Sequence, residues 1–155
     1  AQHMPASFIV AFAKRLDLLT PLNVLVAEQG SKLVAGNVYL APGDINLTIE
    51  SKNGSYVFAS TEERFQAYNC PSIDALMLSA AEAYKDKAIG VVLTGMGKDG
   101  SMGLKAMKVA GSYTIAQSEA SCIVYGMPTA AVQNEAVKQV VHLDEIAAFL
   151  VSCLA

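Results

Sequence analysis

The stretch IGVVLTGMGKDGSMG, residues 89–103, constrains the fold of this chain more than any other. Its first five residues are nearly all apolar, which is typical of a parallel strand that is covered on both faces. A glycine-rich turn follows, and the spacing after it predicts a helix over Ser101–Ala110 that ends at Gly111. A buried strand that leads through a turn into a helix predicts a βα unit, and hence a parallel sheet.

The rest of the chain alternates in the same way between apolar runs of strand length and stretches of helical spacing. Further helices are expected at 7–19 with Ser7 as N-cap, after the N-cap Ser72, near Pro128 and after the N-cap Asp144; further strands are expected at 24–27, 32–35, 38–41, 47–50, 56–59, 113–116 and 139–141. The Asn53-Gly54 pair predicts a tight hairpin, because both residues tolerate positive φ. We therefore expect an α/β fold with a mainly parallel sheet, an antiparallel hairpin edge and helices on both faces.

Composition argues against several classes of protein. With 155 residues, 53% of them hydrophobic, the chain suits a single domain over 1–155. The net charge is −3 and the lysines and arginines are scattered, which argues against a nucleic-acid partner. No apolar segment reaches the roughly 18 residues that a membrane span needs. The three cysteines lie far apart without metal-ligand spacing, so we expect a cytoplasmic protein with neither a disulfide framework nor a metal site.

The glycine-rich turn has the spacing of a phosphate-binding loop. Gly95, Gly97 and Gly100 follow the G-x-G-x-x-G pattern of a dinucleotide-binding turn, at the carboxyl end of a predicted parallel strand, where ligands gather. Glu119 comes about 20 residues later, where a ribose-binding acid would lie. Asp99, however, would lie against the pyrophosphate, and like charges repel strongly in a desolvated site. A phosphate-binding module is therefore one hypothesis among several.

Two other hypotheses explain Asp99 without a phosphate. In one, its carboxylate caps the helix that follows and accepts an amide hydrogen near Met102. In the other, it orients a histidine that acts as a base. The chain offers two histidines. His142 follows a predicted strand and suits a surface position, whereas His3 lies in a His-Met pair of the kind that cloning leaves near an N-terminus. Spacing and composition leave these hypotheses open.

Five segments, spread over essentially the whole chain, carry a resemblance to a known family. They are AQHMPASFIVAFAKRL (1–16), GNVYLAPGD (36–44), CPSIDALM (70–77), VVLTGMGKDG (91–100) and AQSEASCIVYGMP (116–128). In sequence and order they resemble the catalytic domain of the chemotaxis protein-glutamate methylesterase family. The resemblance implies a doubly wound α/β domain with a mainly parallel sheet, in agreement with the periodicity.

The resemblance also implies a chemistry. Members of this family are serine hydrolases that remove methyl groups from glutamate methyl esters on chemoreceptors, and the resemblance allows deamidation of glutamines there. His3 matches the catalytic histidine and Asp99 the triad aspartate. Met96, followed by Gly97, matches the active-site loop in which a backbone amide helps to hold the oxyanion. Such a reaction requires no cofactor and no metal.

One departure from the family concerns the nucleophile. The family's serine lies in a G-x-S-T-G-G turn ahead of the histidine segment, and none of the twelve serines of this chain has that setting. We therefore expect that the chain lacks the N-terminal segment that carries the nucleophile and is inactive without it. Cys122 as a substitute nucleophile, and a non-catalytic fragment or paralogue that binds a receptor, are the alternatives.

The expected partner is a methylated chemoreceptor, and the resemblance allows a receiver domain in the full protein. Neither a nucleic acid nor insertion into a membrane is expected. Glu119 and Ser121 either cap a short helix or shape the substrate groove. Thr129 stands where a basic residue is expected after Gly-Met-Pro, which is a second departure.

Overall fold

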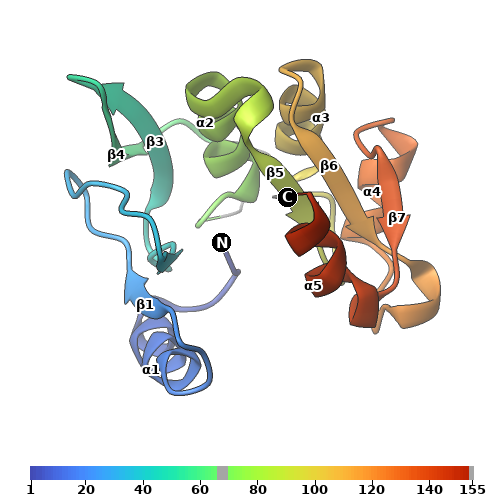
Figure 1. Cartoon of the computed structure of the whole chain (residues 1–155), viewed down its shortest axis with the longest axis horizontal. Coiled ribbons are helices and arrows are strands. Elements are labelled where there is room, and N and C mark those ends of the chain that lie inside the picture. Colours follow the sequence, from blue (N-terminus) through green and yellow to red (C-terminus); the bar gives the residue numbers. More distant parts are fainter. Residues whose placement is uncertain (66–69, 154–155) are drawn as a thin grey trace.

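The computed structural model describes residues 1–65 and 70–153, which form two groups of elements on either side of one helix, α2 (Figure 1). The helices are α1 (Ala6–Asp17), α2 (Ile73–Tyr84), α3 (Ser101–Val109), α4 (Met127–Gln133) and α5 (Leu143–Ser152), with short 3-10 turns at Lys85–Lys87 and Glu119–Ser121. The strands are β1 (Asn23–Val26), β2 (Asn37–Leu40), β3 (Asn46–Lys52), β4 (Ser55–Thr61), β5 (Ile89–Val92), β6 (Tyr113–Gln117) and β7 (Gln139–Val141). No helix among the described residues combines the length and apolar character needed to cross a membrane.

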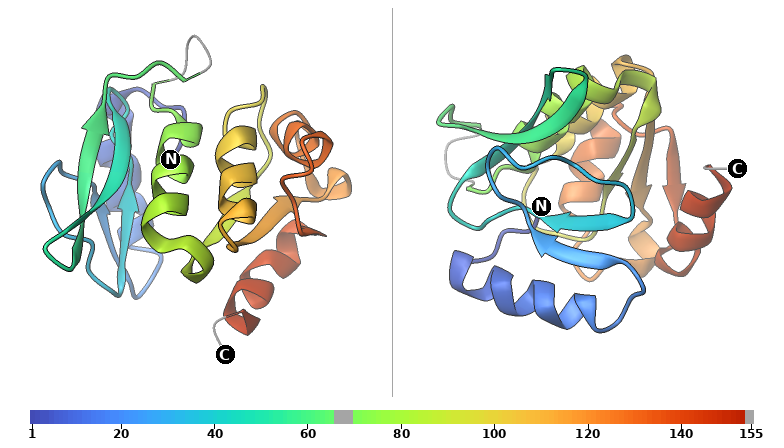
Figure 2. Two further views of the ribbon diagram at one scale, coloured as in Figure 1. Left: turned by 90° about the horizontal axis from the view of Figure 1, so that it is seen from above. Right: turned by 60° about the vertical axis from the view of Figure 1, so that its left-hand side comes forward.

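Strands β5, β6 and β7 form a parallel sheet in that order. On one face, Val92 of β5 belongs to a buried cluster with Leu104 of α3 and Ala131 of α4. On the other face, Ile115 of β6 packs with Ile146 of α5. Figure 2 shows α2, α3 and α4 in a row along one side of these strands and α5 apart from that row. The predicted α/β fold with parallel strands and helices on both faces is confirmed in this part of the chain.

The other four strands form two separate sheets. β1 pairs with β2 in parallel, and β3 pairs with β4 as an antiparallel hairpin. The turn residues Asn53 and Gly54 have φ values of 50° and 74°, which confirms the predicted hairpin turn. The hairpin was expected as an edge of the parallel sheet, and this was wrong, because β3 and β4 pair only with each other among the described strands.

The predicted strand at 32–35 is also wrong. Only Lys32 forms a bridge, with Val57, and the Val34 N–H donates to the hydroxyl of Tyr39 instead of extending the pairing. Gly36 then turns the chain with a φ of 82°. An apolar run of strand length therefore becomes an irregular loop here, because a side-chain hydroxyl competes for its backbone hydrogen bonds.

The helix starts agree with the predicted N-caps in one case of three. Ser72 caps α2, and its Oγ accepts the Ala75 N–H at 3.2 Å. Helix α1 begins after Pro5 rather than after Ser7, since the fixed φ of a proline suits the residue before a helix. Helix α5 begins after His142, and Asp144 lies in its first turn, where its negative charge favours the helix dipole.

Helix α2 joins the two groups of elements. Toward the hairpin, the Oγ of Ser79 accepts the N–H of Ile49 at 3.0 Å. Toward α3, the approach is so close that a Cβ at Gly103 would lie 2.5 Å from the Cβ of Met77. A cavity of about 400 Å³ lies between the groups and is bordered on one side by Phe58 and on the other by β5. Among the described strands, β1 pairs only with β2, and β5 only with β6, so each keeps an open edge.

Candidate active site

Asp99 lies in the loop that follows β5, and its carboxylate accepts the N–H of Gly100, the residue before α3, at 3.1 Å and two N–H groups of α2. Gly100 has a φ of 89°, a conformation that favours glycine, and thereby turns the loop into α3. The Asp99 side chain is 2% exposed and accepts the N–H of Ile73 at 2.7 Å on Oδ2 and the N–H of Asp74 at 2.9 Å on Oδ1. The carboxylate therefore occupies the N-terminus of α2. The hypothesis that Asp99 caps its own helix near Met102 was wrong.

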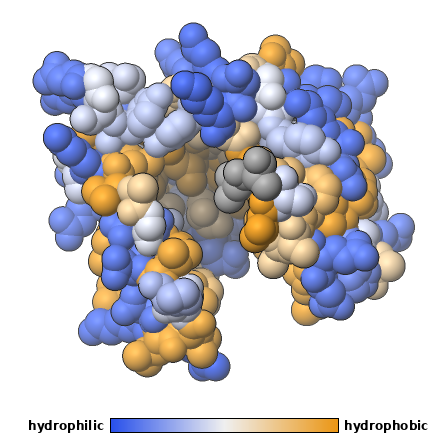
Figure 3. Space-filling view, viewed as in Figure 1, coloured by the Kyte–Doolittle hydropathy of each residue, from blue (hydrophilic) through white to orange (hydrophobic). Residues whose placement is uncertain are grey.

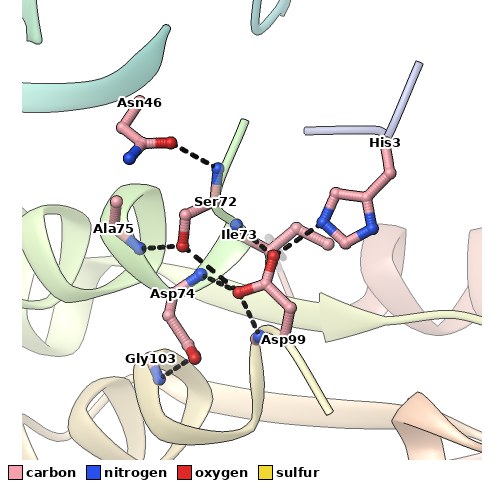
Figure 4. Close-up of polar contacts among 9 residues, drawn as sticks. His3, Asn46, Ser72, Ile73, Asp74, Ala75, Asp99 and Gly103 are labelled. Atoms are coloured by element: carbon pink, nitrogen blue, oxygen red, sulfur yellow. Dashed lines mark hydrogen bonds and ion pairs between the residues drawn. The ribbon is translucent and has the colours of Figure 1, made fainter. Parts of the chain in front are cut away.

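Ser72 connects Asp99 to the hairpin. Its hydroxyl donates to Oδ1 of Asp99 at 3.2 Å, and its N–H donates to Oδ1 of Asn46, the first residue of β3, at 2.8 Å. Figure 4 shows this network running from Asn46 through Ser72 to Asp99. The position of the carboxylate is thus set by three segments that are distant in sequence.

Asp74, and not Asp99, accepts a backbone N–H in the first turn of α3. Its Oδ1 accepts the N–H of Gly103 at 2.7 Å, and its side chain is 1% exposed (Figure 4). Burial raises the pKa of the Asp74 carboxyl, hydrogen bonding from the Gly103 N–H lowers it, and the nearby Asp99 raises it further. The N-terminus of α3 is therefore already engaged by a carboxyl group of the protein itself.

This arrangement disfavours the phosphate-binding hypothesis. In a dinucleotide-binding turn, the phosphate needs the amides at the N-terminus of the helix that follows the glycines. Here the Gly103 N–H donates to Asp74, and Asp99 brings a second acid into the same region. Gly95, Gly97 and Gly100 form a turn that holds a carboxylate of the chain.

His3 meets Asp99 across 96 positions of sequence. The two side chains are joined between His3 Nε2 and Asp99 Oδ2 at 2.7 Å, and the imidazole is 33% exposed (Figure 4). Nε2 faces the carboxylate, and no described residue hydrogen-bonds Nδ1. A carboxylate that fixes one ring nitrogen sets the tautomer and orients the ring.

The segment that carries His3 rests closely on the loop after β2. A Cβ at Gly43 would lie 2.5 Å from the nitrogen of Ala6 and 2.8 Å from the carbonyl carbon of Pro5. Only a glycine lets the two backbones approach in this way. The Pro42-Gly43 turn thus supports the backbone that leads from His3 into α1.

A second cavity of about 400 Å³ lies beside the imidazole, and a hollow is visible at the centre of Figure 3. His3, Met77 of α2, Leu93 and Met96 are among the residues that border the cavity. The side chain of Met96 is 85% exposed, and no described residue accepts a hydrogen bond from its N–H. A role of the Met96 backbone in holding an oxyanion stays a prediction.

Hydrogen bonds from neighbouring segments fix the backbone of Thr94 and Gly95, which precede Met96 and Gly97. The Gly95 oxygen accepts the N–H groups of Gly126 and Met127, and the Thr94 N–H donates to Oε1 of the fully buried Gln117 at 2.8 Å. A backbone donor in this loop therefore has a fixed position, as the stabilisation of an oxyanion requires.

Glu119 and Ser121 belong to the 3-10 turn after β6 and are not among the described residues that border the His3 cavity. The Ser121 backbone oxygen accepts the Gln117 side-chain N–H at 2.7 Å, and its hydroxyl accepts the Leu143 N–H at 3.1 Å. These bonds connect β6 to α5. A contribution of Glu119 and Ser121 to a substrate groove stays a prediction.

Three residues that hold the His3–Asp99 pair in place were not identified as site residues from the sequence. Ser72 was predicted only as a helix cap, Asp74 only as part of a resembling segment, and Gly43 only as a turn. Asp74 offered a detectable signal, because it is an acid inside the first turn of a helix with a long apolar stripe. A buried acid at such a position is uncommon unless it is paired.

The chain matches a known protein family in sequence and in structure. The profile of the CheB methylesterase family matches residues 1–150. The chain is 47% identical over 146 residues to a protein-glutamate methylesterase/protein-glutamine glutaminase of Bordetella bronchiseptica, covering 94% of this chain and 42% of the relative. For the protein of the same name in Ralstonia nicotianae, the identity is 43% over 145 residues, covering 94% of this chain and 38% of the relative.

The structure is similar to a crystal structure of the CheB methylesterase catalytic domain of Thermotoga maritima. The TM-score is 0.93 at 37% sequence identity, and the match covers 98% of this chain and 80% of that one. The chain thus spans about two fifths of the length of the curated relatives it matches.

Proposed function

Because this chain belongs to the CheB methylesterase family, we propose that it supplies the histidine and aspartate of a site that hydrolyses glutamate methyl esters on chemoreceptors. The observation that carries the proposal is the 2.7 Å contact between His3 Nε2 and the buried Asp99 carboxylate, beside a cavity of about 400 Å³. A base that is oriented by an acid next to a pocket is the arrangement that activates a hydroxyl nucleophile.

The proposed reaction begins with a serine hydroxyl from the family's G-x-S-T-G-G turn, which this sequence does not contain. Nδ1 of His3 takes the serine proton as the oxygen attacks the ester carbonyl, and Asp99 stabilises the imidazolium that forms. The Met96 N–H donates to the oxyanion. The imidazolium then protonates the departing methoxide, which leaves as methanol. Water hydrolyses the acyl-enzyme by the same route and releases glutamate.

The same site acts on glutamine if ammonia leaves in place of methanol. The acyl-enzyme is identical in the two reactions, so hydrolysis of either substrate produces glutamate. The proposal further places this chain in the cytoplasm, with a receiver domain as the regulatory partner in the full protein. The names of the relatives, which combine methylesterase and glutaminase, support both activities.

The test is methanol release from methylated chemoreceptor. We expect none from the 155-residue chain, because loss of the serine in a triad costs on the order of a million-fold in turnover. A protein in which the family's serine turn is restored ahead of Ala1 should release methanol. In that protein, His3→Ala should abolish nearly all release, and Asp99→Asn should cost roughly ten-thousand-fold by leaving the wrong tautomer.

Two outcomes would contradict this proposal. If the restored protein is folded and binds receptor but releases no methanol, the chain is a receptor-binding module without catalysis. If the 155-residue chain is fully active, its nucleophile lies within it, and Cys122→Ser becomes the next variant to measure.

A further inference from the structure

Two buried aspartates each bind the N-terminus of a helix other than the one next to them in sequence. Asp99 precedes α3 but accepts the N–H groups of Ile73 and Asp74 in the first turn of α2. Asp74 belongs to α2 but accepts the N–H of Gly103 in α3. Each carboxyl group thus lies at the positive end of the other residue's helix, where a negative charge is favourable.

Asp74 is unfavourable for stability in one respect. Its Oδ2 is buried and accepts no hydrogen bond of ordinary geometry from the described residues, although the backbone N–H groups of Gly100 and Met102 lie close enough to lower the pKa of the carboxyl. Burial raises the pKa of this carboxyl, and the neighbouring Asp99 raises it further. An incompletely paired acid in a helix interface costs free energy that an apolar residue would not. A buried polar group that keeps an unsatisfied atom calls for an explanation, of which a functional role is one.

We propose that Asp74 is a positioning residue for the His3–Asp99 pair. Its side chain holds the first turn of α3 through the Gly103 N–H at 2.7 Å, and its own N–H holds Oδ1 of Asp99 at 2.9 Å. The loop between these two points therefore cannot withdraw the carboxylate from the imidazole. This role rests on the proposed function in that His3 serves as the base, but the bonds that define it do not depend on hydrolysis.

The role is one of position rather than charge. An asparagine at residue 74 has nearly the same shape and keeps an Oδ1 acceptor for the Gly103 N–H. Alanine and leucine both remove the acceptor, and leucine also fills the space of the lost group. Asp74→Asn should therefore preserve the His3–Asp99 contact, whereas Asp74→Ala and Asp74→Leu should weaken it.

The measurement is the signal of the His3 Nε2–H proton in nitrogen-15 NMR spectra of the 155-residue chain. A ring proton that is bonded to a buried carboxylate exchanges slowly with water and is observed far downfield. The chain has only one other histidine, His142, which gives a simple spectrum. We expect the His3 signal in the wild type and in Asp74→Asn, and its loss in Asp74→Ala and Asp74→Leu.

Ser79→Ala provides the matched control. Ser79 lies on the same helix and also accepts a backbone N–H from another element, that of Ile49 at 3.0 Å, but it does not contact Asp99. Its loss should lower the melting temperature and leave the His3 signal in place. A comparable loss of signal in Ser79→Ala would show that general loosening of α2 is responsible, and would overturn the proposal.

Three further results would overturn it. The first is a retained His3 signal in a folded Asp74→Ala or Asp74→Leu variant, and the second is loss of the signal in a folded Asp74→Asn variant. The third is failure of both apolar variants to fold, which would make Asp74 a general stability residue. If the restored enzyme releases no methanol while the NMR pattern is as expected, the proposed function fails and the positioning role stands.

Discussion

Among the described residues, Asp74 and Asp99 are the two acids with fully buried side chains. The structure gives them different surroundings. Asp99 accepts hydrogen bonds on both oxygens and meets His3, whereas Asp74 has one oxygen that accepts no hydrogen bond of ordinary geometry from the described residues. This difference makes Asp74 the acid whose ionisation should be visible in the stability of the chain.

The stability should depend on pH through Asp74. Its pKa is raised above the ordinary 3.8, chiefly by burial, so the folded chain holds this proton more tightly than the unfolded chain does. The contribution of Asp74 to the free energy of unfolding is therefore greatest below that value and falls as pH rises through the folded pKa. We expect Asp74→Asn to gain stability relative to the wild type as the pH rises above about 4, in urea titrations at several pH values.

Asp144→Asn is the control for this pH dependence, because the Asp144 side chain is 86% exposed. Its stability should run parallel to that of the wild type over the same range, apart from its weak contact with His142. A constant difference between Asp74→Asn and the wild type at every pH would contradict the expectation.

Among the residues of the site, His3 and Asp99 were predicted as partners through the family resemblance, and the structure brings their side chains together. The sequence did not indicate which amides Asp99 would bind. The local pattern favoured the helix that follows Asp99, whereas the true partners lie about 25 residues earlier, at Ile73 and Asp74. Local spacing cannot reveal such a partner, because it depends on how two helices pack.

At the scale of elements, the turn after β2 is predicted to control the position of His3. A methyl group at residue 43 would collide with the backbone of Pro5 and Ala6, which cannot move aside like a flexible side chain. Gly43→Ala should therefore shift the N-terminal segment. The cost should be about 1–3 kcal/mol in the free energy of unfolding, as for other overpacked sites.

The readouts for Gly43→Ala are chemical denaturation and the His3 Nε2–H signal, which should weaken. Gly54→Ala is a suitable control because a Cβ there meets nothing within 4 Å, although its φ of 74° makes the substitution strained in its own right. Loss of stability without any change at His3 in Gly43→Ala would show that this turn does not position the histidine.

The elements themselves were predictable wherever their pattern was local. The strand at 139–141 and the hairpin turn at Asn53-Gly54 were correct because periodicity and turn chemistry act over a few residues. The strand at 32–35 failed because the Tyr39 hydroxyl competes for a backbone N–H. The predicted caps of α1 and α5 failed for other reasons: Pro5, with its fixed φ, precedes α1 in place of Ser7, and the His142 side chain accepts the N–H of Asp144 at the start of α5.

At the scale of the whole molecule, β1 and β5 each have one edge that pairs with no other described strand. The sequence indicated parallel strands but not their division into three sheets, because strand order depends on contacts between distant segments. An unpaired edge offers free N–H and C=O groups to another strand. Leu25 of β1, which is 45% exposed, adds an apolar side chain to one such edge.

We expect the 155-residue chain to self-associate as its concentration rises, and Leu25→Lys to suppress this association, because a charge on an edge strand opposes pairing with a second chain. Sedimentation velocity over a concentration series is the measurement. Val34→Lys is the control, since Val34 is 56% exposed but lies outside the strands. Equal suppression by both lysines would indicate a charge effect on solubility and not edge pairing.

The exchange of aspartates between α2 and α3 has a consequence for the order of folding. A helix end that is completed by its neighbour cannot be finished before the neighbour arrives, so the first turns of both helices should form in a single cooperative step. His3, 96 positions away from Asp99, can dock only on the product of that step. A chain caught part-way through folding would therefore have no His3–Asp99 contact, and that contact would report completion of the fold.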